Sequence, residues 1–331
     1  QQRQMCIRDR CNTMNYIGAK NKLLPFLDTN ITNTVGSLKG KVFCDIFAGT
    51  GAVGRYFKTR VSKIIANDME FYSYVLNKNY IANHRPIDAN MLIDELNSLV
   101  GVEGFIFENY AEGGKEHRLY FSSENAKKID AIRQKIEEWK NQNFLSENVY
   151  YFLLASLLEC ADKVANTASV YGAFLKSLKK TAQKPLILEP ALFQINDNLH
   201  DVFQRDSNDL IKDIDGDVLY MDPPYNTRQY GANYHLLNTI ALYDEFTPKG
   251  KTGMRNYARS KYCSNSSVSR TFEDLISHAN FKYIFLSYNN EGLMSFDEIK
   301  NIMSRYGKYK VVSTDYQPVS YTHLRAHETG R

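Results

Sequence analysis

The sequence has few of the residues that hold small secreted domains together. Its 331 residues include five cysteines and one tryptophan. Three cysteines stand in the central part of the chain, at Cys44, Cys160 and Cys263, an odd number at wide spacing. No C-x-x-C pair is present that could bind a metal. This pattern excludes a disulfide framework and predicts free thiols in a reducing cytosol, with no metal site.

Long apolar runs and a strong charge of either sign are also lacking. No run reaches the roughly 18 residues that a membrane helix needs, and nothing after Met14 has the pattern of a signal peptide. The 41 basic and 37 acidic residues give a net charge of only +4. We therefore expect a cytoplasmic protein without a membrane partner, in which any basic binding surface is local.

The two ends of the chain differ from the rest. Residues 1–13, which include QQRQMCIRDR, and residues 319–331, VSYTHLRAHETGR, resemble translated sequencing-adapter sequence. We interpret both as artefacts, with Met14 as the native start and the native C-terminus missing. Without them the net charge of +4 loses two units from the first segment and one from the second, which leaves +1.

Strand and helix patterns alternate along the chain. KVFCDIF (41–47) and SKIIAND (62–68) predict buried strands, each followed by a helical pattern. Strand patterns return at 200–206, 216–222, 281–289 and 308–315. In the long stretch before residue 200, the spacing of apolar residues favours helices instead. The sequence thus predicts an α/β fold with a parallel sheet formed by residues 14–85 and 198–318, and a mostly helical insertion at 86–197.

A glycine-rich turn follows the first predicted strand, in DIFAGTGAVG. Gly49, Gly51 and Gly54 allow a tight turn into a helix and a close approach of the backbone to a ligand. Asp68 ends the second predicted strand seventeen residues after Gly51, near the spacing at which an acid binds ribose hydroxyls. Together these features favour an adenosine-bearing cofactor. The loop lacks the phosphate-binding pattern G-x-x-x-x-G-K-[ST].

The stretch VLYMDPPYNTRQY (218–230) ends another predicted strand with Asp222, Pro223, Pro224 and Tyr225. The prolines alone explain the end of the strand, but not the carboxylate and the ring where parallel sheets bind ligands. Methyl transfer to an exocyclic amine needs acceptors that direct the nitrogen lone pair at the methyl group. Asp222 and the Pro223 carbonyl can supply them, held by the stiff Pro–Pro unit. Tyr225 offers a face for a base that has left its duplex.

Four segments in this order resemble the D12 class of N6-adenine-specific DNA methyltransferases: NYIGAK (15–20), DIFAGTG, ND and DPPY. The resemblance implies a Rossmann-like, S-adenosylmethionine-dependent methyltransferase sheet with target recognition in the helical insertion. It implies double-stranded DNA as substrate and S-adenosyl-L-methionine as cofactor. The cofactor contacts implied by position are Tyr16, Gly18, Lys20, Phe47, Gly49, Gly51, Asp68, Asp206 and Asp222.

Basic residues interleaved with aromatic ones follow the DPPY motif, in PKGKTGMRNYARSKYC (248–263). This composition suits phosphate contacts and base stacking, although a solvated surface would show the same pattern. Arg228, Gln229 and Tyr230, which adjoin the motif, could fill the gap left by a flipped base. The predicted DNA-binding residues are Arg228, Gln229, Lys251, Arg255, Arg259 and Lys261.

These features predict direct transfer of a methyl group to N6 of a flipped adenine at a specific DNA site, with a cognate restriction endonuclease as a candidate partner. No cysteine stands in the proline–cysteine setting that methylation of a cytosine ring carbon requires. N4-cytosine or RNA amino-methylation is one alternative, which the methylated nucleoside would identify. A truncated or non-catalytic DNA-binding fragment is another, and it would bind cofactor without turnover.

Overall fold

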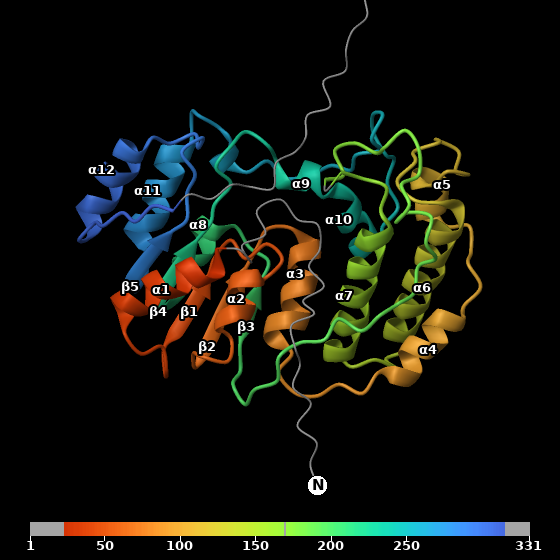
Figure 1. Cartoon of the computed structure of the whole chain (residues 1–331), viewed down its shortest axis with the longest axis horizontal. Helices are drawn as coiled ribbons and strands as arrows, with labels where there is room; N and C mark the ends of the chain where they lie inside the picture. Colours follow the sequence, from red (N-terminus) through yellow and green to blue (C-terminus); the bar gives the residue numbers. More distant parts are fainter. Residues whose placement is uncertain (1–22, 169, 315–331) are drawn as a thin grey trace, which may run out of the picture.

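A five-stranded parallel sheet occupies one end of the molecule and a group of helices the other (Figure 1). The computed structural model describes residues 23–168 and 170–314. The strand order is β3-β2-β1-β4-β5. The strands are β1 Val42–Asp45, β2 Lys63–Asn67, β3 Asp201–Phe203, β4 Asp215–Met221 and β5 Asn280–Leu286. The predicted α/β class with a parallel Rossmann-like sheet is confirmed.

Both faces of the sheet are covered by helices. Phe43 and Val218, paired across β1 and β4, face the layer of α1 (Leu24–Val35) and α2 (Ala52–Phe57). Their neighbours Cys44 and Leu219 face the layer of α11 (Val268–His278) and α12 (Phe296–Tyr306). Because a parallel sheet is buried on both sides, its strands are apolar at nearly every position. This explains why the short apolar runs could be recognised as strands.

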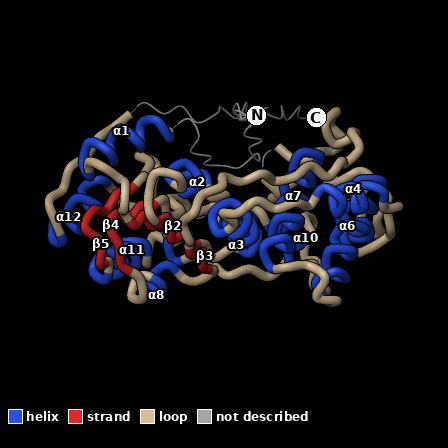
Figure 2. Tube along the Cα trace, turned by 90° about the horizontal axis from the view of Figure 1, so that it is seen from below, coloured by secondary structure: helices blue, strands red, loops and turns tan. Residues whose placement is uncertain are grey.

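The helical part of the molecule has a core of its own. It contains α4 (Asn90–Ser98), α5 (Phe105–Tyr110), α6 (Ser123–Asn141) and α7 (Glu147–Val164). The predicted apolar stripe of α6, which includes Ile129, Ile132 and Ile136, is fully buried in this core. α3 (Phe71–Asn77) and the π-helix η2 (Lys78–Ala82) lie between this core and the sheet (Figure 2).

Helices that follow the DPPY motif belong to the same core. α10 (His235–Leu242) contributes Leu236 and Ile240 to the helical part, and Tyr234, which links it to α9 (Tyr230–Asn233), is buried there too. Two short elements, α8 (Ser207–Leu210) and η3 (Lys261–Cys263), stay beside the sheet. The chain therefore returns from β4 to the helical part before it forms β5, so the predicted sheet-forming segment 198–318 is divided in space.

The predicted strand at 308–315 is wrong for the residues that the structure describes. Residues 307–314 form neither helix nor strand, and Val311 and Val312 are 65% and 48% exposed. The alternating pattern is present, but a strand requires a neighbour, and in the described chain β5 pairs only with β4.

The predicted helical insertion is helical only as far as Val164. The described residues between 165 and 200 form neither helix nor strand. Amide side chains of the preceding helices hold this segment: Asn125 donates to the carbonyls of Ala182 and Lys184, and Asn97 bonds both backbone groups of Leu188. Backbone polar groups that a helix would pair internally are paired by side chains here. No helix of residues 23–314 is long and apolar enough to cross a membrane.

Candidate active site

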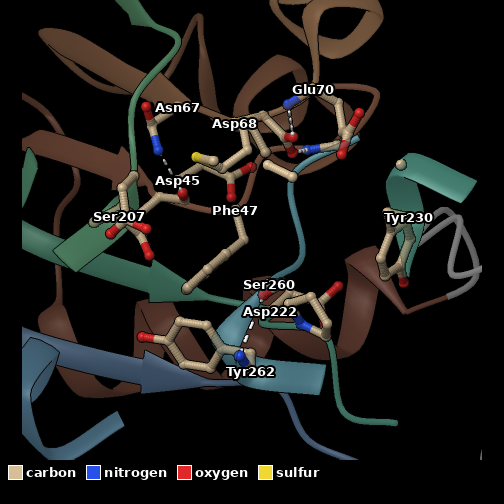
Figure 3. A pocket seen from close by; sticks show the side chains of 18 of the residues that line it. Asp45, Phe47, Asn67, Asp68, Glu70, Ser207, Asp222, Tyr230, Ser260 and Tyr262 are labelled. Carbon is tan, nitrogen blue, oxygen red and sulfur yellow. Dashed lines mark hydrogen bonds between the residues drawn. The ribbon is translucent and has the colours of Figure 1, made fainter. Parts of the chain in front are cut away.

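The order of the strands creates a switch point between β1 and β4. From β1 the chain continues through β2 to β3 on one side, whereas β4 and β5 lie on the other. Open α/β sheets bind ligands in the crevice that forms at the carboxyl ends of such strands. A pocket opens there (Figure 3). Five of the predicted cofactor-binding residues line it: Phe47, Gly49, Asp68, Asp206 and Asp222.

The glycine-rich loop after β1 is held from two sides. Gly49 has a positive φ of 53° and donates its N–H to Asp68 Oδ2 at 2.8 Å. Its carbonyl accepts from Ser73 Oγ and from Asn77 Nδ2. Gly51, the next glycine of the loop, does not line the pocket. Its φ of 79° begins α2, and a Cβ there would lie 2.6 Å from Asn77 Oδ1.

Asp68 lies at the end of β2 with its carboxylate fixed. Oδ2 accepts from Gly49, and Oδ1 accepts the N–H of Glu70 at 2.9 Å. Burial raises the pKa of Asp68, and these backbone N–H groups oppose the rise. Each carboxylate oxygen can accept more than one hydrogen bond, so ribose hydroxyls can share this group.

Asn67, which the sequence analysis did not single out, holds the ends of three strands together. Its amide donates to the carbonyl of Ile46 after β1 and to that of Arg205 after β3, at 3.1 and 3.0 Å. Its Oδ1 accepts the N–H of Arg205 at 3.0 Å. The only sequence signal for this role was its place beside Asp68 at the end of a predicted strand.

The DPPY loop continues directly from β4. The loop after β5 supports it, because Ser287 donates its N–H to the Met221 carbonyl and Leu293 to that of Tyr225, both at 2.8 Å. On its other side, Ser260 donates its N–H to Gln229 Oε1 at 2.8 Å. These bonds place Asp222 in the pocket wall, with Pro224 beside it.

Phe47 and Tyr262 form an aromatic corner of the pocket. Their rings meet edge to face, with centroids 5.1 Å apart. Tyr262 is buried, and its hydroxyl donates to Asn208 Oδ1 at 2.9 Å. The sequence analysis had placed Tyr262 in a basic, aromatic run facing DNA. Tyr230 and Glu70 are further pocket residues that it did not assign to the cofactor site.

The predicted DNA-binding residues fall into distinct environments. Arg228 and Lys251 are exposed, and Arg259 and Lys261 are exposed at the pocket. Arg255 differs, since its guanidinium pairs with both carboxylate oxygens of Asp244 at 2.9 Å and its side chain is only 12% exposed. The intramolecular pair uses two of the five N–H donors of the guanidinium. Tyr16, Gly18 and Lys20 lie outside the described residues.

Acidic side chains dominate the charge of the pocket. Five carboxylates line it, and two basic side chains, Arg259 and Lys261, stand against them. The carboxylates belong to Asp45, Asp68, Glu70, Asp206 and Asp222. Such a set attracts a ligand with positive charge.

The switch-point pocket of this parallel sheet contains a fixed acid, an aromatic corner and a DPPY loop, which together are typical of an α/β enzyme. The chain belongs to the D12 class of N6 adenine-specific DNA methyltransferases, whose family model matches residues 16–304. The predicted family and the predicted activity of an adenine-specific DNA methyltransferase are confirmed.

Individual relatives agree with this assignment. The chain is 64% identical to the Type II methyltransferase M.NlaIII of Neisseria lactamica over 306 residues. These residues are 92% of each of the two chains. It is 35% identical over 313 residues to the Type II methyltransferase M.CviAII of Paramecium bursaria Chlorella virus 1, again 92% of both. The Type II methyltransferase M.FokI of Planomicrobium okeanokoites is 37% identical over 326 residues, which are 94% of this chain but 50% of that relative. No solved structure matches.

Proposed function

We propose that this chain transfers a methyl group from S-adenosyl-L-methionine to N6 of an adenine flipped out of duplex DNA at a specific site. The observation that carries the proposal is the convergence of Gly49, Asp68 and Asp222 on one pocket of a chain in this family. The three residues follow three different strands, and the switch point brings them together.

The charged and aromatic lining of the pocket suits S-adenosyl-L-methionine. When bound, this cofactor supplies an electrophilic methyl group on a positively charged sulfur. Three residues that line the pocket are proposed to contact the cofactor: Asp68 accepts ribose hydroxyls, and Asp206 and Phe47 lie beside the adenine ring. The excess of carboxylates in the pocket compensates the sulfonium charge. Tyr16, Gly18 and Lys20 remain proposed cofactor contacts from the N-terminal segment.

The DPPY loop orients the target amine. Asp222 and the carbonyl of Pro223 accept its two N–H groups, which directs the nitrogen lone pair toward the methyl group. The bond from Leu293 to the Tyr225 carbonyl keeps the loop in place, and the Tyr225 ring offers a stacking face for the flipped base. No covalent bond between enzyme and base is required.

DNA is proposed to contact four exposed basic residues: Arg259 and Lys261 at the pocket, Arg228 next to the pocket residue Gln229, and Lys251 in a loop that Arg118 holds. Phosphate contacts of this kind weaken as salt rises, because each one releases counterions. Gln229 is proposed to face the site of the flipped base, and Arg255 to hold its loop through Asp244. A restriction endonuclease that recognises the same site is the proposed functional partner.

The first test incubates the full chain with labelled S-adenosyl-L-methionine and unmethylated genomic DNA and identifies the modified nucleoside. We expect N6-methyladenine, and we expect Asp222→Ala to lower its rate by about 100-fold or more, because orientation of the amine is lost. Asp94→Ala, on an exposed turn of α4, is the matched control and should leave the rate unchanged.

Other products would change the conclusion. N4-methylcytosine or methylated RNA would keep the fold and cofactor but reject the substrate. Cofactor binding without any product would identify a non-catalytic DNA-binding protein.

A further inference from the structure

Glu70 is a carboxylate in the pocket wall that the mechanism above does not use. It lies two residues after Asp68, at the start of α3, and is half-buried beside the pocket. Its side chain does not cap α3. A negative charge at a helix start interacts favourably with the helix dipole, but this carboxylate also has specific partners at the pocket.

Two sets of contacts join Glu70 to separate parts of the site. Its N–H donates to Asp68 Oδ1 at 2.9 Å, which helps to fix the proposed ribose acid. Its Oε2 accepts from Asn238 Nδ2 of α10 at 2.5 Å. Asn238 is in turn held by the N–H of Tyr72, which donates to Asn238 Oδ1 at 2.9 Å. Figure 3 shows Glu70 beside Asp68 in the pocket wall.

Glu70 also lies against the segment that leaves the DPPY loop. A Cβ at Gly231 would lie 3.0 Å from Glu70 Oε1 and 2.8 Å from the Cβ of Tyr257. The backbone at Gly231 therefore passes between Glu70 and the loop at Tyr257 with no room for a side chain. Tyr230, the residue before it, lines the pocket. Glu70 thus contacts the cofactor side of the site through its backbone N–H and the target side through its carboxylate.

We propose that Glu70 and Asn238 form a positioning pair that places the segment Tyr230–Gly231 relative to the cofactor acid Asp68, and so aligns the target adenine with the methyl group. The inference rests on the proposed function. A misalignment of about 1 Å at the reacting atoms can lower a rate by about 100-fold without changing how tightly a substrate binds. The pair should therefore act on kcat rather than on cofactor affinity.

The charge of Glu70 gives the pair a pH dependence. Burial, and then the charge of Asp68, raise the pKa of Glu70 to about 7, while Asn238 and Arg255 oppose the rise. The ionised carboxylate accepts a stronger hydrogen bond from Asn238 than the protonated acid does. The rate should therefore fall as the pH drops below about 7.

The test exchanges the carboxylate and the amide between positions 70 and 238. Asn238→Asp removes the donor and sets two carboxylates against each other, whereas Glu70→Gln combined with Asn238→Asp restores one N–H···O bond with reversed direction. In the double variant, the carboxylate introduced on α10 can still accept the N–H of Tyr72. We expect kcat of Asn238→Asp at pH 8 to fall by about 10-fold or more, and kcat of the double variant to return to within about 3-fold of the wild type.

Three further readouts separate positioning from stability. The cofactor dissociation constant should change by less than about 3-fold in all variants. Glu70→Gln alone, which can still accept from Asn238, should remove the rate change near pH 7. Melting temperatures are measured in parallel, with Glu95→Gln on the exposed face of α4 as the matched control.

The outcomes are distinguishable. If Asn238→Asp keeps the wild-type kcat, or if the double variant does not recover, the inference is wrong. If kcat follows only the melting temperatures, the pair is merely structural. If the wild-type chain forms no N6-methyladenine, the proposed function itself fails.

Discussion

At the scale of single residues, Lys58 has an unusual environment. It follows α2, its side chain is fully buried, and its ammonium donates to the carbonyls of Tyr80, Asn83 and Gln194. Burial, and then the charge of Arg55, lower the pKa of Lys58 to about 7. The three carbonyls match the three N–H donors of an ammonium group and compensate the cost of burying it. One side chain thus joins α2, the end of η2 and the segment that returns to β3.

Lys58→Met should destabilise the fold by about 3 kcal/mol, because it leaves three carbonyls without their donor. Urea unfolding of the variant and the wild type measures the difference. Lys39→Met, the same change at an exposed position, should alter stability by no more than about 0.5 kcal/mol. Equal losses for the two variants would show that the carbonyls have found other donors.

At the scale of elements, the end of α10 depends on a side chain of α6. Arg133 of α6 donates to the carbonyls of Ile240 and Ala241, the last turn of α10, at 3.1 and 3.0 Å. Its third contact is Glu137 on its own helix, at 2.8 Å. Helix ends leave carbonyls without partners, and a guanidinium satisfies two of them at once. This contact attaches the helix that carries Asn238 to the helical core.

Arg133→Met should destabilise the protein by about 3 kcal/mol and should also lower methyl transfer, since α10 carries one member of the positioning pair. Unfolding and activity are measured on the same preparation. Lys135→Met removes an exposed ion pair with Glu138 on the same helix, a change that should cost less than about 1 kcal/mol. Full activity in a destabilised Arg133→Met would show that the end of α10 does not govern the site.

At the scale of the whole molecule, the sheet and the helical part each bury a histidine. His200 accepts the N–H of Ile64 in β2 on Nδ1 at 2.9 Å. His235 lies among tyrosine rings, with Nε2 at 3.0 Å from the Tyr171 carbonyl. Burial lowers the pKa of both side chains to about 4.

The contribution of these two histidines to stability should therefore fall as the pH drops from 6.5 toward 4, whereas the raised pKa of Glu70 acts in the opposite direction. In this window the unfolded histidines take up protons while the folded ones stay neutral, at about 1.4 kcal/mol per pH unit for each histidine. His235→Gln should remove one of the two contributions and flatten the slope. Chemical unfolding of both proteins between pH 4.5 and 7 measures this slope of stability against pH. Identical slopes for the variant and the wild type would contradict the prediction.

The parts of the site that could be predicted from the sequence are those with local patterns. The loop of Gly49, the acid Asp68 and the DPPY motif each follow a strand, and the apolar runs marked these strands. Gly51 shows where such patterns are ambiguous. Its positive φ and the nearby Asn77 side chain, which leaves no room for a Cβ, explain why a glycine stands there without any ligand. Arg255 shows that composition is an ambiguous guide. The basic and aromatic run that contains it suggested contact with DNA, whereas its guanidinium pairs with Asp244, eleven residues earlier.

The sequence by itself determined the α/β class, the order of the motifs and the family, because periodicity and motif spacing are properties of neighbouring residues. Only the tertiary structure decided that 308–314 forms no strand, that α10 joins the helical core, and that Asn238 reaches Glu70 across 168 positions. The physical reason is that strand pairing and buried hydrogen bonds depend on which distant groups the fold brings within about 3 Å of each other.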